Sequence, residues 1–164
     1  ETYLKIISAK TAELFAAATK VGAILSGMKS KEKEALEFYG RNLGLTFQIA
    51  DDTLDYNSEL KLFGKKIGQD FYEGKITLPI ILLFQRADDK EKERLKEIFS
   101  KNLRNKDDLE YSLSLIKKYE IIKACYKKAE HYINLASNSL SVFGDSEEKS
   151  ILENLTSFSL TRNF

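Results

Sequence analysis

Apolar side chains recur three or four residues apart along most of this 164-residue chain, and no stretch keeps the two-residue alternation of a half-buried strand. The chain also contains only one proline and eight glycines, which favours helix throughout. The spacing predicts helices over residues 3–26, 31–57, 90–101, 106–117, 119–140 and 147–160, and another that begins at Leu78–Pro79. We therefore predict an all-α fold.

The organisation that this pattern predicts is a single domain over residues 1–164. No proline-rich or glycine-rich linker divides the chain, and its length is typical of one domain. The longest predicted connection, Ser58–Thr77, is expected to be a loop and carries Gly64, Gly68 and Gly74.

The first predicted helix mixes large and small apolar residues. Leu14, Val21 and Leu25 follow helical spacing, and the same helix holds the small-residue run Ala16–Thr19 and Gly22. Small side chains let other helices approach closely, so a helix of this kind is usually interior to a bundle. The helices predicted from this chain are too few to surround it.

Charge, cysteine content and the length of apolar runs exclude several classes of protein. Lys plus Arg number 26 and Asp plus Glu number 25, so the net charge of +1 gives no case for nucleic-acid binding. The single cysteine, Cys125, excludes an internal disulfide and fits a reducing compartment, so we expect a cytoplasmic protein. The longest apolar run, Leu78–Phe84, is far shorter than the roughly 20 residues of a membrane span, and no signal peptide is recognisable.

The stretch Phe47–Tyr56 carries a stripe of acidic side chains in an otherwise apolar helix. At about 100° per residue, Asp51, Asp52 and Asp55 fall with Gln48 inside a wedge of roughly 100°. Carboxylates at the C-terminal end of a helix face the negative end of its dipole, which is unfavourable unless a cation is present. Mg²⁺ takes such oxygen ligands together with substrate phosphates. The alternative is a solvated helix face.

The predicted loop that follows is rich in lysine and glycine. Lys65, Lys66 and Lys75 are point charges suited to phosphate, and Asp70 and Glu73 are placed to orient them. Next to the acidic stripe, this loop favours metal-assisted phosphate chemistry. An ordinary charged surface loop is the alternative.

Three segments resemble motifs of the trans-polyprenyl diphosphate synthases, and together they cover nearly the whole chain. The sequence FQIADDTLDY followed by GKKIGQDFYEGKITLP is similar to the family's second aspartate-rich motif and its downstream loop. KTAELF resembles the family's K-T-A segment, and LSVFGDSEEKSILENLTSFSLTR resembles its C-terminal helices. The segment EGKITLP resembles the corresponding segment of the long-chain synthases that make quinone side chains.

The resemblance implies a helical bundle of the isoprenoid synthase type and a prenyl transfer that joins isopentenyl diphosphate to an allylic diphosphate. It implies Mg²⁺ as cofactor, a homodimeric parent enzyme and a lipid product that brings the enzyme near membranes. The residues it assigns are metal ligands Asp51, Asp52 and Asp55, catalytic Lys10, Lys65 and Lys75, and substrate contacts Lys10, Thr11, Gln48, Lys65 and Lys75. Lys66 is an alternative to its neighbour Lys65.

One part of the family pattern is missing. The family's first aspartate-rich motif, with the arginines that follow it, occurs nowhere in these 164 residues. We therefore expect the chain to correspond to the C-terminal half of such an enzyme, without the N-terminal helices of the bundle, and to be inactive alone. A non-catalytic subunit that binds a partner is the alternative function.

Overall fold

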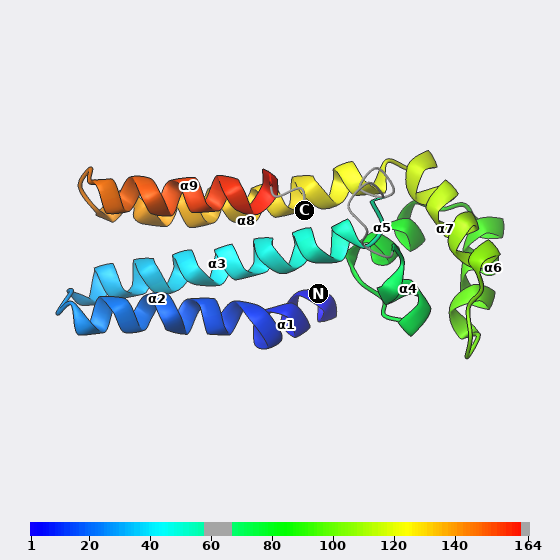
Figure 1. The fold of residues 1–164 in the computed structure, drawn as a ribbon, viewed down its shortest axis with the longest axis horizontal. Helices are drawn as coiled ribbons and strands as arrows, with labels where there is room; N and C mark the ends of the chain where they lie inside the picture. The colour runs from blue at the N-terminus through cyan, green and yellow to red at the C-terminus, as the bar shows by residue number, and fades with distance from the viewer. Residues whose placement is uncertain (58–66, 162–164) are drawn as a thin grey trace. The chain divides into compact units, whose positions relative to one another are not determined.

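The computed structural model describes residues 1–57 and 67–161, and it is helical and without strands over these residues (Figure 1). This confirms the predicted all-α fold. The helices are α1 (Thr2–Ile7), α2 (Glu13–Leu25), α3 (Ser30–Leu54), α4 (Gln69–Glu73), α5 (Leu78–Arg86), α6 (Asp89–Ser100), α7 (Lys106–Lys118), α8 (Ile121–Ser139) and α9 (Glu147–Thr161), with a π-helical turn η1 (Ser8–Ala12) and a 3₁₀ turn η3 (Leu140–Val142).

The chain divides into two units, which we describe separately. The first contains Glu1–Ala50 and the described part of Lys127–Asn163, and the second contains Asp51–Tyr126 apart from residues 58–66. The single domain expected from the sequence stays a prediction.

In the first unit, the α1–η1–α2 segment packs closely on α3. A Cβ atom on Gly44 would lie 2.6 Å from the Ala12 Cα atom, and one on Gly40 would lie 2.5 Å from the Phe15 carbonyl oxygen. Real Cβ atoms do not approach other atoms so closely, so both α3 positions require glycine. The Thr19 hydroxyl also donates to the Leu36 carbonyl oxygen at 2.6 Å.

The π-helical turn η1 keeps this segment's buried residues on one side. Ile7, Ala12 and Ala16 are at most 4% exposed. Five residues of regular α-helix would rotate Ala12 about 140° away from Ile7. The wider π turn removes most of that rotation, so Ile7, Ala12 and Ala16 lie on the same buried side.

The outward face of α2 carries the large apolar residues of this helix. Leu14, Val21 and Leu25 are exposed in this structure, as expected for a helix that the predicted helices of this chain are too few to surround, whereas Ala16 and Ala23 are buried. Glycine and alanine permit the close packing on α3, and the larger side chains are left on the opposite side.

Helices α8 and α9 complete the first unit beside α3. Its core cluster contains Tyr39, Leu43, Ala136 and Leu140. The Tyr39 hydroxyl donates to the Leu152 carbonyl oxygen of α9 at 2.8 Å, so the one polar atom of this buried ring is paired.

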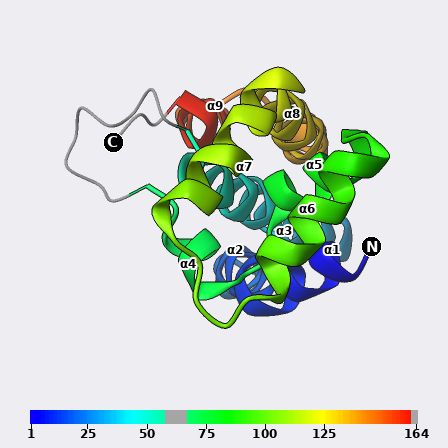
Figure 2. The same ribbon diagram turned by 90° about the vertical axis from the view of Figure 1, so that its right-hand side faces the viewer.

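The second unit contains the short helices α4 to α7 (Figure 2), and aromatic rings pack together among them. The Phe99 ring of α6 meets the edges of Phe71 and Phe84, with ring centroids 5.4 and 6.1 Å apart. Helices α6 and α7 each begin with a capping box, formed by Asp88 with Glu91 and by Asn105 with Asp108. Such reciprocal caps satisfy backbone donors that a helix cannot pair internally.

The observed helices follow the predicted ranges closely, with one correction in the predicted loop. Residues 58–77 were expected to be a loop, but Gln69–Glu73 form the short helix α4 within it. Cys125 is fully buried, and burial raises the pKa of its thiol to about 12. Among residues 1–57 and 67–161, no helix is both long and apolar enough to cross a membrane.

Candidate functional site

In the first unit, the close approach of α3 to the η1 turn joins two predicted substrate residues. Gly44 leaves room for the backbone of Ala12. One turn further along α3, the Gln48 side-chain oxygen accepts a hydrogen bond of 2.8 Å from the Thr11 hydroxyl. Thr11 and Gln48, 37 residues apart in sequence, therefore form one polar pair.

Lys10 lies in the same π-helical turn as Thr11. Its side chain is exposed, whereas Thr11 and Gln48 are partly buried. A cation beside a partly buried hydroxyl–amide pair is a suitable arrangement for an anionic group of a ligand.

In the second unit, the three predicted metal ligands differ in burial. Asp51 is exposed, whereas Asp52 and Asp55 are only 5% and 6% exposed. Asp51 and Asp52 lie in the last turn of α3, which ends at Leu54, and Asp55 follows directly. The aspartate motif therefore includes the end of the helix and its first connecting residue.

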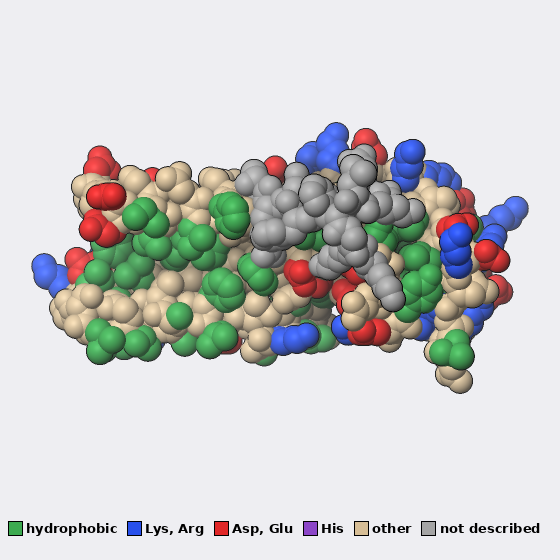
Figure 3. Space-filling view, in the orientation of Figure 1, with side chains coloured by type: hydrophobic (Ala, Val, Ile, Leu, Met, Phe, Trp, Pro, Cys, Tyr) green, Lys and Arg blue, Asp and Glu red, His purple; other side chains and the backbone are tan. Residues whose placement is uncertain are grey.

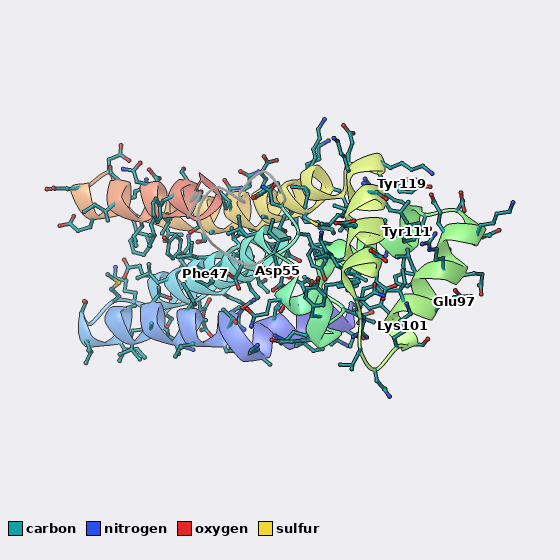
Figure 4. The ribbon with its side chains drawn as sticks, turned by 45° about the vertical axis from the view of Figure 1, so that its right-hand side comes forward. Phe47, Asp55, Glu97, Lys101, Tyr111 and Tyr119 are labelled. Atoms are coloured by element: carbon teal, nitrogen blue, oxygen red, sulfur yellow. The ribbon has the colours of Figure 1, made fainter. Side chains whose placement is uncertain are left out.

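Asp55 clamps the end of α3 to the start of α4 (Figure 4). Its two carboxylate oxygens accept hydrogen bonds from the backbone amides of Gln69 and Asp70, at 3.1 and 3.0 Å. Its own carbonyl oxygen accepts from the Gly68 amide at 2.9 Å. Gly68 has φ 83°, a left-handed conformation that suits glycine. The carboxylate thus satisfies two unpaired amides at a helix start.

The segment that Asp55 holds carries the predicted cation Lys75. Gly74, with φ 75°, turns the chain so that the Lys75 ammonium lies 3.0 Å from Asp70 and 2.6 Å from Glu73. Glu73 and then Asp70 raise the pKa of Lys75, so this side chain stays protonated. The expectation that Asp70 and Glu73 orient a lysine is met at Lys75.

Tyr56 is a buried neighbour of this acidic group that sequence reasoning missed. Its side chain is 1% exposed. Burial, followed by the charges of Asp55 and Asp70, raises the pKa of its phenol, which therefore remains protonated. Its position directly after the aspartate motif was the only sequence signal available.

Two features of the predicted site, the loop lysine and the metal cluster, stay predictions. Lys65, with its alternative Lys66, falls outside the described residues. Within residues 1–57 and 67–161, no three histidine, cysteine, aspartate or glutamate side chains are close enough together to hold a metal ion.

Comparison with known proteins identifies the family. The family model for polyprenyl synthetase matches residues 1–116. The chain belongs to the polyprenyl synthetase family. The short chain isoprenyl diphosphate synthase of Methanothermobacter thermautotrophicus is 36% identical over 162 residues, which are 99% of this chain and 49% of that protein. The octaprenyl diphosphate synthase of Haemophilus influenzae is 29% identical over the same share of both proteins.

A solved polyprenyl synthetase structure extends the similarity to the fold. The polyprenyl synthase of Caulobacter crescentus, crystallised with calcium and isoprenyl diphosphate, superposes with a TM-score of 0.91 at 39% identity. The match covers 99% of this chain and 49% of that one. The chain therefore spans about half the length of the relatives it matches.

Proposed function

We propose that this chain supplies metal-binding and diphosphate-binding residues for prenyl transfer from an allylic diphosphate to isopentenyl diphosphate. The observation that carries the proposal is the pairing of Asp55 with the Gln69 and Asp70 amides. It joins the end of the acidic helix to the segment bearing Lys75, and a diphosphate–metal complex requires both charges.

The donor set suits Mg²⁺. The ion prefers oxygen ligands and usually takes one or two carboxylates, with waters and phosphate oxygens completing its shell. Asp51 and Asp52, neighbours in the last turn of α3, would hold it, and Asp55 would fix the end of the helix beside them. When bound, Mg²⁺ neutralises charge on a leaving diphosphate.

The remaining polar residues bind and orient the diphosphates. Lys75, kept protonated by Glu73 and Asp70, contributes positive charge toward phosphate oxygens. Lys10, with Lys65 from outside the described residues, contributes further positive charge. The hydrogen bond from the Thr11 hydroxyl to the Gln48 side-chain oxygen fixes the direction of both side chains, so that they meet a ligand in one orientation.

Several finer features belong to the proposal. The resemblance of the segment EGKITLP to long-chain synthases supports a long-chain product for a quinone side chain. The similar proteins include both short-chain and octaprenyl synthases. We also propose that the parent enzyme is a cytoplasmic homodimer. It would act near membranes because its product is a lipid.

Calorimetry with inorganic pyrophosphate and MgCl₂ tests the site in this chain. We expect saturable binding that needs Mg²⁺ and is weakened at least tenfold by Asp51→Asn. Asp107→Asn is the matched control, because Asp107 is also an exposed aspartate but lies at the start of α7. Equal binding by wild type and Asp51→Asn would contradict the proposal.

A non-catalytic subunit that binds a partner is the second candidate, favoured by the exposed apolar face of α2. The same titration separates the two functions. A subunit without a site would bind neither Mg²⁺ nor pyrophosphate, whatever residue occupies position 51.

A further inference from the structure

Arg104 lies in the connection between α6 and α7, and its guanidinium reaches the end of α4 within the second unit. One terminal nitrogen, Nη2, donates to the Phe99 carbonyl oxygen at 2.9 Å, and the other, Nη1, donates to the Tyr72 carbonyl oxygen at 3.4 Å. The guanidinium also lies over the Phe99 ring, 5.3 Å from its centroid. This side chain therefore ties the last turn of α6 to the segment that leads into Lys75.

Gly74 provides the space that this guanidinium occupies. A Cβ atom on Gly74 would lie 2.8 Å from Nη2 of Arg104 and 2.9 Å from Nη1. Real Cβ atoms do not approach other atoms so closely, so the guanidinium fills the place where another residue would carry its side chain. Arg104 thus packs directly against the backbone of the residue that precedes Lys75.

The partners of Arg104 differ from those of nearby cations. Figure 3 shows cationic and acidic side chains intermixed over α6 and α7. In this region Lys101 pairs with Asp108, with 2.6 Å between nitrogen and oxygen. Among residues 1–57 and 67–161, no carboxylate forms an ion pair with Arg104. A guanidinium presents several donors in one rigid plane, which suits two separate carbonyl oxygens. Its contacts therefore fix backbone rather than neutralise a charge.

The backbone next to Arg104 sets the direction of Lys75. The Gly74 amide donates to the Phe71 carbonyl oxygen at 3.0 Å, and the Lys75 amide donates to the Asp70 carbonyl oxygen at 2.9 Å. These two bonds close the turn that ends α4. The Lys75 side chain is 52% exposed, and a long flexible side chain keeps one direction only where its backbone is fixed.

We propose that Arg104 is a positioning residue, which fixes the Tyr72–Gly74 backbone so that Lys75 meets a diphosphate in one orientation. The site uses the two-pronged shape of the guanidinium and not its positive charge. The part played by Lys75 rests on the proposed function. The effect of Arg104 on the turn rests on its hydrogen bonds and on the space at Gly74.

Hydrogen exchange, followed by NMR in the complete chain, tests the effect on the turn without any ligand. Arg104→Ala should speed exchange of the Gly74 and Lys75 amides at least tenfold, because the turn can then open locally. Arg104→Lys should do the same, since one ammonium cannot reproduce the fixed donors of a guanidinium. Arg94→Ala is the matched control, because Arg94 also lies over a ring, 3.8 Å from the centroid of Tyr111, but is placed in α6.

Two results of this experiment would overturn the proposal. One is exchange at wild-type rates at the Gly74 and Lys75 amides of Arg104→Ala. The other is an equal acceleration at the amides of α8, in the first unit, because Arg104 would then contribute only to general stability.

Titration with inorganic pyrophosphate and MgCl₂ tests whether Arg104 acts through Lys75. We expect Lys75→Ala and Arg104→Ala each to weaken binding about tenfold, and the double variant to bind as well as Lys75→Ala alone. Arg104→Lys should weaken binding as much as Arg104→Ala, and Arg94→Ala should bind like wild type. Additive losses in the double variant, or wild-type binding by Arg104→Lys, would overturn the proposal, since Arg104 would then act through its own charge.

The two measurements separate this proposal from the proposed function. Faster exchange at the turn in Arg104→Ala, in a chain whose wild type binds no pyrophosphate, would refute the proposed function and leave the effect on the turn established. Wild-type exchange and binding in Arg104→Ala, with binding lost in Lys75→Ala, would refute the positioning role and leave the proposed function intact.

Discussion

The three aspartates of one short motif have different surroundings. Asp51 is exposed in the last turn of α3, whereas Asp55 is buried and gives both carboxylate oxygens to backbone amides. The motif therefore combines an accessible carboxylate with a buried one that holds the start of α4.

Replacing Asp55 should cost more stability than replacing Asp51. Asp55→Asn exchanges one accepting oxygen for an amide nitrogen and leaves a partly buried backbone donor unpaired, at a cost of about 1–3 kcal/mol. Urea denaturation followed by circular dichroism measures this free energy of unfolding. Asp51→Asn, at an exposed position, should change it by less than about 0.5 kcal/mol. Equal losses in the two variants would show that the clamp is not stabilising.

Sequence reasoning could place these side chains on one helix face but not find their partners. Helical spacing alone brings Asp51, Asp52 and Asp55 into one wedge. The amides that Asp55 binds lie 14 and 15 residues further along the chain, and backbone groups leave no pattern in a sequence. The pair of Thr11 and Gln48 was equally out of reach, because it depends on how close two helices come.

That closeness can be tested at the level of the helices. Gly44→Ala would place a Cβ atom 2.6 Å from the Ala12 backbone, so α3 and the η1 turn must separate. Overpacking of this kind costs about 1–3 kcal/mol, and the separation should also lengthen the Thr11–Gln48 hydrogen bond. Thermal unfolding should show a lower midpoint for this variant. Gly144→Ala, where a Cβ atom meets nothing within 4 Å, should not lower the midpoint.

The contact of α6 with the end of α7 should make the free energy of unfolding depend on pH in the acidic range. Glu91 accepts from the Lys118 ammonium at 2.7 Å and the Tyr119 hydroxyl at 2.6 Å, and Lys118 first, then Tyr119, lowers its pKa from 4.5 to about 2. A lowered folded-state pKa stabilises above the unfolded value and loses that effect as pH falls through the folded value.

Unfolding free energy should therefore fall between about pH 4.5 and pH 2, and Glu91→Gln should reduce the steepness of this fall. Urea titrations at several pH values measure the slope. Glu97→Gln, on the same helix, is the control and should keep the wild-type slope. An unchanged slope in Glu91→Gln would exclude this carboxylate as a source of the acid sensitivity.

The bounds of a helix were predictable where apolar spacing continued over several turns. They were not predictable for a short element. The α3, α6, α7 and α9 ranges agree with the apolar spacing within a few residues. The five-residue α4 shows no period, and its start depends on Asp55 outside it. Spacing also identified the apolar residues of α2 but not the side that the rest of the unit covers, because a buried alanine gives a weaker signal than an exposed leucine.

At the scale of the whole molecule, the activity that we expect depends on how much of a related enzyme this chain spans. The chain has one aspartate-rich motif, and it aligns with 49% of a complete polyprenyl synthase. If prenyl transfer needs two opposed carboxylate clusters, as the family resemblance implies, a chain with one cluster should be unable to catalyse it. The reason is electrostatic, since half the positive charge around the leaving diphosphate would be missing.

The chain incubated with Mg²⁺, farnesyl diphosphate and labelled isopentenyl diphosphate should therefore form no elongated product. Chromatography of the labelled lipids measures this directly. Co-expression with the unmatched half of the Caulobacter crescentus synthase should give product, and Asp51→Ala in this chain should abolish it while that half still co-purifies with the chain. The Asp107→Ala variant serves as the control and should retain product. Robust elongation by the chain alone would mean that its own residues complete the site, and the second cluster would then be dispensable.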